Sequence, residues 1–199
     1  MARDRLSDAA HRGDWTGVLA AVEEAPNLIN ARRVGGRSGW APLHQAAWHN
    51  APIEVVERLL AAGAWRTLLS ADGERPLDLA TRLGREALLP LLEPAPLHPA
   101  RESDLRALQH FLHALIRVRT EEFGVTAPLV LPQVSVLTEL SDPALGFTVP
   151  GMYGGFSILL ERGQDGPQLT VRSHCRIVGY SGRTHRITPD DCTVVESGW

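Results

Sequence analysis

Apolar residues in the first half of the chain recur in three blocks at a nearly constant spacing. Leu6, Leu43 and Leu77 open equivalent blocks and lie 37 and then 34 residues apart. An alanine stands three positions after each of these leucines, and each block continues into an apolar segment. A period of this length predicts three helix pairs over residues 1–95 that stack on one another and approach closely at the alanines.

The pattern changes in the middle of the chain. The segment 92–99 contains three prolines, which end any helix there. Apolar residues then follow at steps of three and four over residues 103–122, with Ser103 or Asp104 as N-cap and Gly124 as terminator. We expect residues 96–124 to form a linker and a capping helix.

The last third of the chain is typical of strands. Residues 156–162 and 168–178 alternate apolar and polar positions around a Gly- and Pro-containing turn. Further strands are expected over 133–140, 145–149 and 193–196. The spacing predicts an antiparallel meander or a small open barrel of four to six strands over residues 125–199. The fold class is therefore α+β.

Composition and charge exclude several classes of protein. The 199 residues carry a formal net charge of −3, with no basic excess of the kind that nucleic-acid binders need. The longest apolar runs are about six residues, far short of a membrane span, and no apolar segment follows the charged start of the chain. We expect a cytoplasmic protein that binds neither nucleic acid nor membrane.

All 20 basic residues are arginine, and this bias suggests a bacterial source with a GC-rich genome. Without lysine there is no Schiff-base chemistry and no Walker-type phosphate loop. The two cysteines, Cys175 and Cys192, are too few for a disulfide scaffold. Neither C-x-x-C nor H-x-x-x-H spacing occurs, so a zinc site is not expected, nor is a cofactor.

The residues 41–47, Ala-Pro-Leu-His-Gln-Ala-Ala, followed by the apolar segment that ends at Gly63-Ala64, resemble an ankyrin repeat. Residues 75–80 resemble the degraded signature of a last repeat. The signature threonine is replaced by Ala41 and Arg75, and Pro90 falls where the last helix is expected to kink or shorten. Residues 149–156 loosely resemble tails of uncharacterised bacterial ankyrin-repeat proteins.

The resemblance implies which residues face a partner on the concave side of the stack. Trp and Arg, the residues most enriched at binding hot spots, dominate the set. The expected partner-binding residues are His11, Arg12, Arg33, Arg37, Trp40, Trp48, His49, Trp65, Arg66 and Arg82. The alternative is that the tryptophans pack between repeats or against the helix 103–122.

A second candidate lies on the predicted strand 168–178. Its outward positions form a row of basic side chains, and the nearby His185 extends the set. The possible anion-binding residues are Arg172, His174, Arg176 and His185. The alternative is a solvated sheet face, with Glu161 and Glu196 as cross-strand partners. Alternation places Cys175 on the inward side, which argues against a catalytic cysteine.

Together these observations predict a non-catalytic module that binds an unidentified protein partner on the concave face of the helix stack. Two alternatives remain open. One is a small enzyme or anion-binding protein with its site in the C-terminal β-domain. The other is an immunity or inhibitor protein.

Overall fold

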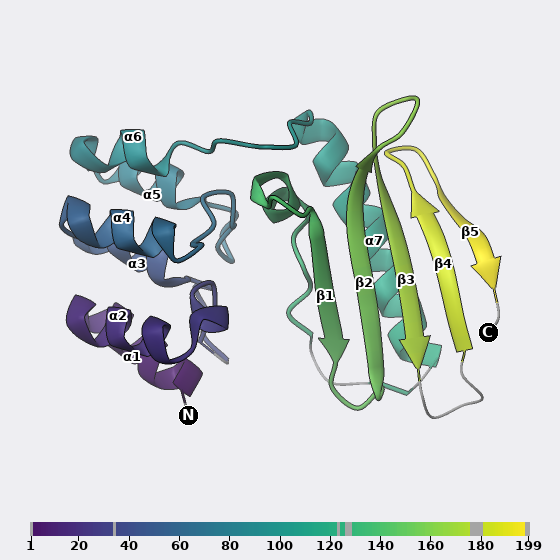
Figure 1. Ribbon diagram of the computed structural model, residues 1–199, viewed down its shortest axis with the longest axis horizontal. Coiled ribbons are helices and arrows are strands. Elements are labelled where there is room, and N and C mark those ends of the chain that lie inside the picture. The colour runs from purple at the N-terminus through teal and green to yellow at the C-terminus, as the bar shows by residue number, and fades with distance from the viewer. Residues whose placement is uncertain (1, 34, 123, 126–128, 176–180, 198–199) are drawn as a thin grey trace. The chain divides into compact units, whose positions relative to one another are not determined.

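The computed structural model describes residues 2–33, 35–122, 124–125, 129–175 and 181–197 (Figure 1). The chain divides into two compact units, residues 1–95 and residues 96–199, and each has its own apolar core. The first unit is helical, whereas the second combines helices with an antiparallel sheet, so the predicted α+β class is confirmed.

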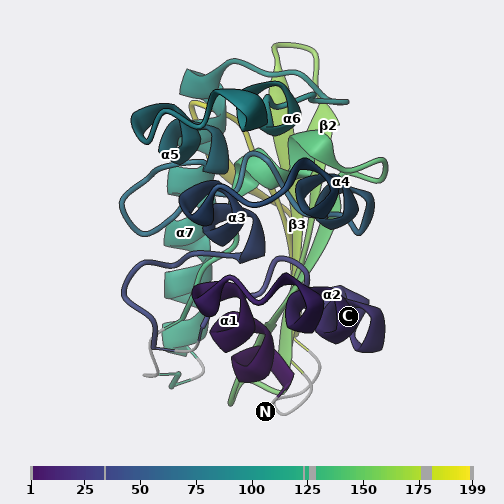
Figure 2. The ribbon, with the colours of Figure 1, turned by 90° about the vertical axis from the view of Figure 1, so that its left-hand side faces the viewer.

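The first unit consists of three helix pairs that follow one another along the chain. Figure 2 shows the first helices of the pairs stacked in one column and the second helices in another. The pairs are α1 (Ala2–Arg12) with α2 (Trp15–Glu24), α3 (Pro42–His49) with α4 (Ile53–Ala61), and α5 (Pro76–Arg82) with α6 (Leu89–Leu92). Two short 3₁₀ turns complete the unit, η1 (Pro26–Leu28) and η2 (Glu86–Leu88).

Local sequence sets the ends of these helices. Pro42 and Pro76 stand at the first helical position, where a missing N–H costs nothing. The Asp14 side chain accepts a hydrogen bond from the Gly17 amide and begins α2. Asn50 ends α3 in the left-handed conformation, with φ 52°. The helix α6 has only four residues, as Pro90 within it predicts.

The core of the first unit lies where the first helices touch. Ala9, Ala46 and Ala80 are at most 5% exposed, and α3 contacts both α1 and α5. Leucines at the repeat positions, Leu6 and Leu43, are buried beside them. The small side chains let the helices approach, and the leucines fill the space on either side.

Polar bonds join each repeat to the next. The Asn30 amide donates to the Gly63 carbonyl at 2.9 Å and accepts from the Trp65 amide at 2.9 Å. Arg66 Nε donates to the Leu91 carbonyl at 2.8 Å. The buried His44 ring lies 3.1 Å from the Glu74 carbonyl through Nε2, while its Nδ1 accepts from the Ala41 amide.

The second unit is a five-stranded antiparallel sheet with a long helix on one face. Its strands pair in the order of the sequence, and the sheet is open at both edges. The elements are α7 (Glu102–Glu122), η3 (Val134–Glu139), β1 (Ala144–Val149), β2 (Gly154–Arg162), β3 (Pro167–Cys175), β4 (Ser181–Ile187) and β5 (Cys192–Ser197).

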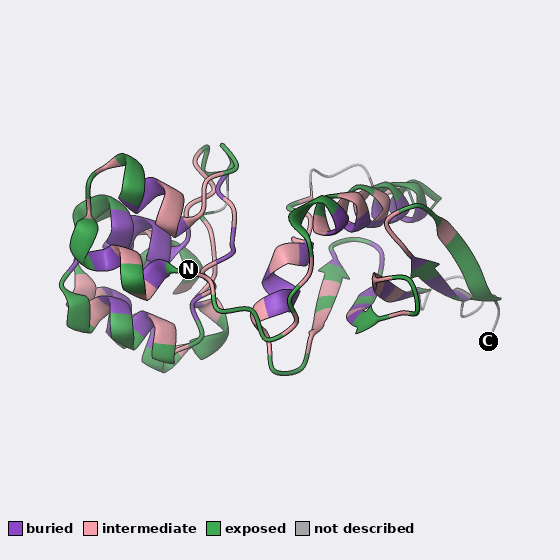
Figure 3. Cartoon of the chain, turned by 90° about the horizontal axis from the view of Figure 1, so that it is seen from above, coloured by how far each residue is buried: buried purple, intermediate pink, exposed green. Residues whose placement is uncertain are grey.

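The helix α7 packs on β3 and β4, and its buried side faces the sheet while exposed residues cover its outer side (Figure 3). Leu108, Leu112 and Ile116 join the core formed by the inward strand residues. The sequence interpretation set residues 96–124 apart as a linker and capping helix, whereas this helix supplies part of the core of the second unit.

One strand prediction was wrong, and one strand was not predicted. Residues 133–140 were expected to be a strand, but Val134–Glu139 is the 3₁₀ helix η3. Its alternating valines do point into the core, yet the segment forms a helical turn that contacts α7 and β2. The strand β4 was not predicted, because its residues 181–186 are glycine or polar and give no apolar alternation.

Gly155 and Gly146 provide a matched test of how closely β1 and β2 approach. A Cβ at Gly155 would lie 2.3 Å from the Phe147 carbonyl oxygen, whereas one at Gly146 meets no heavy atom within 4 Å. We expect Gly155→Ala to lower the free energy of unfolding of the second unit by about 1–3 kcal/mol. Hydrogen exchange followed by mass spectrometry should show faster exchange in β1 and β2, with Gly146→Ala as the unaffected control. Equal exchange in the two variants would contradict this packing.

His44 makes the stability of the first unit depend on pH. Burial, the largest cause, lowers the pKa of His44 to about 4 from its ordinary 6.5. Between these values the unfolded chain binds a proton that the folded unit does not, so stability falls as pH decreases from 6.5 towards 4. We expect a loss of about 2 kcal/mol between pH 7.5 and 4.5. Urea unfolding followed by tryptophan fluorescence measures it.

His44→Gln is the control for this pH effect. The variant removes the titrating ring but leaves every other ionisable group in place. Its free energy of unfolding should change less than that of the wild type over the same pH range. The same change in both proteins would assign the pH dependence to other groups.

Candidate functional site

The C-terminal ends of α1, α3 and α5 carry five of the expected partner-binding residues, namely His11, Arg12, Trp48, His49 and Arg82. Two hydrogen bonds join these ends side by side. His49 Nε2 lies 2.9 Å from the His11 carbonyl, and Arg85 donates to the Trp48 carbonyl at 3.3 Å. All five side chains belong to exposed residues, so they form one accessible row.

A pair of tryptophans lies along α3. The rings of Trp40 and Trp48 are 5.2 Å apart between centroids and tilted by 47°. Trp48 is 42% exposed, the smallest fraction among the large apolar residues of the described chain that are exposed, whereas Trp40 is half-buried. An exposed aromatic ring held by a second ring is rigid and presents a large apolar surface at low entropic cost.

The arginines around this pair differ in how they are neutralised. Arg33 forms an ion pair with Asp8, and Arg82 donates two hydrogen bonds to Glu74, at 2.7 and 3.0 Å. Among the residues that the structure describes, Arg12 and Arg37 form no ion pair and are exposed. These two guanidinium groups are available to a partner.

Trp65 and Arg66 do not join the row. They follow α4 and form the hydrogen bonds to Asn30 and Leu91 described above. Both residues are half-buried. The Arg66 side chain is engaged in one of these bonds, whereas Trp65 takes part in the other through its backbone amide.

A cavity of about 320 Å³ lies between α1, the segment 31–41 and the start of α3, and we call it the α1–α3 cavity. The expected residues Arg33, Arg37, His11 and Trp40 line it. The other lining residues are Ser7, Ala10, Ala31, Gly36, Ser38, Gly39, Ala41, Pro42 and Gln45. No aspartate or glutamate lies among them.

Three residues that line the α1–α3 cavity hold buried polar atoms without a hydrogen-bond partner. These atoms are Ser7 Oγ, Trp40 Nε1 and Gln45 Oε1, and Gln45 itself is only 8% exposed. Each such atom costs about 1–3 kcal/mol of stability. Three in one place are unusual for a surface whose role is only structural.

Ser7 and Gln45 are functional candidates that sequence reasoning missed. Ser7 lies between Leu6 and Asp8, and Gln45 lies between His44 and Ala46. A polar residue in such a setting is expected to be solvated or to bond locally. Only the absence of a partner in three dimensions distinguishes them, and no sequence signal carries that information.

The second candidate set, the basic row on β3, does not assemble as expected. Arg172 and His174 are exposed on the face of the sheet opposite α7. His185 pairs with the inward Val171 and is only 5% exposed, so it lies on the other face and its inclusion was wrong. The unbroken register of β4 on β3 places it there, and Arg176 lies outside the described residues.

The surroundings of His185 and the cysteines give no nucleophile. Burial lowers the pKa of His185, and the charges of Arg119 and Arg183 lower it further. Cys175 is 3% exposed and its thiol donates to the Met152 carbonyl, while burial raises the pKa of the Cys192 thiol. Over the described ranges, no three His, Cys, Asp or Glu side chains converge to hold a metal ion.

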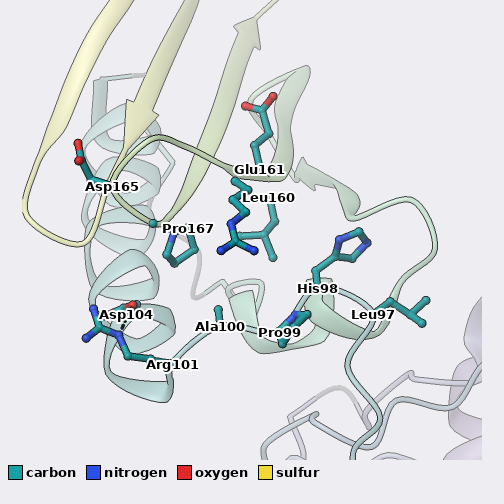
Figure 4. Close-up of a pocket in the computed structure, with 12 residues that line it drawn as sticks. Leu97, His98, Pro99, Ala100, Arg101, Asp104, Leu160, Glu161, Asp165 and Pro167 are labelled. Atoms are coloured by element: carbon teal, nitrogen blue, oxygen red, sulfur yellow. Dashed lines mark hydrogen bonds and ion pairs between the residues drawn. The ribbon is translucent and has the colours of Figure 1, made fainter.

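A larger cavity of about 550 Å³ lies in the second unit, between the segment 97–104 and the β2–β3 hairpin (Figure 4). Several of its polar groups already have partners within the unit. Arg101 donates to Asp104 at 2.9 Å, His98 contacts the Leu140 carbonyl at 3.1 Å, and Glu161 accepts from Thr170. It therefore lacks the unpartnered buried atoms of the α1–α3 cavity.

Comparison with known proteins relates part of the chain to ankyrin-repeat proteins. No protein-family model matches the chain. Ankyrin repeat domain-containing protein 40 of Mus musculus is 36% identical over 80 residues, and that of Homo sapiens is 35% identical over 80 residues. The match covers 40% of this chain but only 21% of each relative.

The chain thus spans about a fifth of the length of these curated relatives. The similarity indicates ankyrin-like repeats and suggests a module for protein interaction. Both relatives are mammalian, so the bacterial source expected from composition stays a prediction. No helix among the described residues is long and apolar enough to cross a membrane.

The unpartnered hydroxyl of Ser7 predicts an unusual effect on stability. Ser7→Ala removes a buried group that forms no hydrogen bond and places a better helix former in α1. We expect the free energy of unfolding of the first unit to rise by about 0.5–1 kcal/mol.

Ser70→Ala is the matched control for this variant. Ser70 is also buried, at 6% exposed, but its Oγ accepts from the Asp72 and Glu74 amides, each at 3.2 Å. This variant should lose about 1–2 kcal/mol in the same urea titration. A destabilised Ser7→Ala would mean that the hydroxyl is satisfied in the folded chain.

Proposed function

We propose that the first unit is a short ankyrin-type helix stack that binds a protein partner, and that the chain is not an enzyme. The partner-binding surface comprises the row at the helix ends, the Trp40–Trp48 pair, Arg37 and the α1–α3 cavity. The single observation that carries the proposal is Trp48, an exposed ring fixed against a second ring at the centre of this surface.

The chemistry of the surface is that of a binding hot spot. Such sites combine aromatic rings and arginines with a rim of polar residues, and a few residues carry most of the affinity. Trp48 supplies the apolar anchor, Arg12 and Arg37 supply guanidinium groups, and His11, Arg33, His49 and Arg82 complete the rim. The mammalian relatives, which are ankyrin repeat domain-containing proteins, support the same class of function.

The second unit takes a supporting role in this proposal. Its anion-binding row is reduced to Arg172 and His174, and its cysteines are poor nucleophiles in their settings. Neither observation favours an enzyme or an inhibitor site there. The sheet and α7 form a separately folded body attached to the binding unit.

Affinity capture with the full chain tests the proposal. Trp48→Ala removes the exposed ring, whereas Ile53→Ala removes an equally exposed apolar side chain, 44% against 42%, from the start of α4. A protein captured from a lysate of the source organism should then be titrated against each variant. We expect Trp48→Ala to raise the dissociation constant of this complex at least about tenfold, which corresponds to a loss of about 1.4 kcal/mol in binding free energy.

Ile53→Ala should leave the affinity unchanged, and thermal unfolding should confirm that both variants are folded. A partner that binds Trp48→Ala and Arg12→Ala as tightly as the wild type would contradict the proposal. In that case recognition would use another surface, and the outer face of the sheet with Arg172 and His174 would be the next to test.

A further inference from the structure

We propose that the α1–α3 cavity is a subsite for a carboxylate group of the bound partner. The inference rests on the proposed function, because it assigns a ligand chemistry to one part of the same surface. It is carried by three features of the cavity, namely its charge, its unpartnered buried atoms and its size.

The charge of the cavity favours an anion. Arg33 and Arg37 line it, and its lining includes no acidic residue. Arg33 is neutralised by Asp8, which lies outside the lining, whereas Arg37 forms no ion pair within the described part of the chain. A group that enters therefore meets one uncompensated guanidinium, whose planar fork matches the two oxygens of a carboxylate.

The three unpartnered atoms of the cavity-lining residues indicate which hydrogen bonds a ligand could supply. The Trp40 indole N–H can only donate, and the Ser7 hydroxyl can donate by rotation about its C–O bond. Gln45 contributes a carboxamide, which presents either its oxygen or its NH₂ group depending on the rotation of its terminal bond. A carboxylate accepts from several donors at once, and hydrogen bonds to a charged acceptor are about twice as strong as neutral ones.

The volume fits a side chain rather than a large ligand. A cavity of about 320 Å³ stands at the lower limit of small-molecule pockets, which run from about 300 to 1,000 Å³. Trp40 lines the cavity and its ring also packs against the ring of the exposed Trp48. A partner segment packed on Trp48 is thus adjacent to a residue that lines the cavity, and one acidic side chain or a terminal carboxylate can enter.

Nuclear magnetic resonance of the ¹⁵N-labelled full chain tests the subsite directly. The chain has five tryptophans, and the indole signal of Trp40 is identified as the one absent from Trp40→Phe. The probe is N-acetyl-glutamate N-methylamide, and its neutral isostere, N-acetyl-glutamine N-methylamide, is the control. We expect a saturable shift of the Trp40 indole signal with the glutamate probe and at least tenfold weaker binding of the glutamine probe.

Two arginine variants locate the charge that selects the ligand. Arg37→Gln should weaken binding of the glutamate probe about tenfold or more. Arg3→Gln, an exposed position on α1 outside the cavity lining, should leave it unchanged. Equal effects of the two variants would overturn the assignment to this cavity, because they would reflect overall charge alone.

Two further probes distinguish the sources of the carboxylate. N-acetyl-alanyl-alanine with a free C-terminus presents a terminal carboxylate, and its C-terminal amide is the matched control. If this probe binds more tightly than the glutamate probe, the carboxylate comes from a chain end of the partner. If the glutamate probe binds more tightly, it comes from an acidic side chain. Both results support the subsite. Inorganic phosphate that binds more tightly than either carboxylate would overturn it.

Failure of the subsite is distinct from failure of the proposed function. A Trp40 signal that stays fixed with both carboxylate probes up to about 50 mM would overturn the subsite. Capture that still depends on Trp48 would then leave the proposed function standing. Conversely, probe binding without any dependence of capture on Trp48 would support the subsite as an isolated carboxylate site and contradict partner binding at this surface.

Discussion

Close contact at alanine is the constraint on which the first unit depends. The first helix of the middle pair contacts those of the other two pairs, and Ala9, Ala46 and Ala80 are buried on these helices. The helices must therefore stack directly on one another, which places their C-terminal ends in one row. The exposed Trp48, the basic residues beside it and the α1–α3 cavity all follow from that stacking.

The hydrogen bonds between successive repeats also hold the helix pairs in this stack. A helix pair cannot bury its apolar face alone, so each pair needs a fixed neighbour. Asn30, His44 and Arg66 hold the connecting segments to the next repeat through backbone atoms, and these bonds are independent of the neighbour's side chains. The segment that forms one wall of the cavity is joined to α1 by the ion pair of Arg33 with Asp8.

Sequence reasoning could predict the parts of the fold that repeat or alternate. The helix pairs follow from leucines and alanines at constant spacing, and β2 and β3 follow from regular alternation. Residues 133–140 misled it because Val134 and Val136 alternate in a segment too short to distinguish a strand from a 3₁₀ turn. The strand β4 escaped it because its residues 181–186 are glycine or polar, so the inward position of His185 carries no apolar signal.

Sequence reasoning could predict the exposed residues of the candidate site but not its buried ones. Composition draws attention to Trp48 and the arginines, because aromatic and arginine residues are expected at binding surfaces. Whether Ser7 or Gln45 has a hydrogen-bond partner depends on which groups surround it after folding. The same limit applies to Arg66, whose residue type is that of a hot spot but whose side chain bonds to the Leu91 carbonyl of the next repeat.

The order of the strands has a kinetic consequence. Every strand of the sheet pairs with its immediate neighbour in the chain, so no contact within the sheet has to wait for a distant segment to arrive. Domains dominated by such local pairings fold faster than those with crossed connections, because little loop-closure entropy precedes each new contact. The sheet can therefore be assembled hairpin by hairpin as the chain leaves the ribosome, on a helix that has already been synthesised.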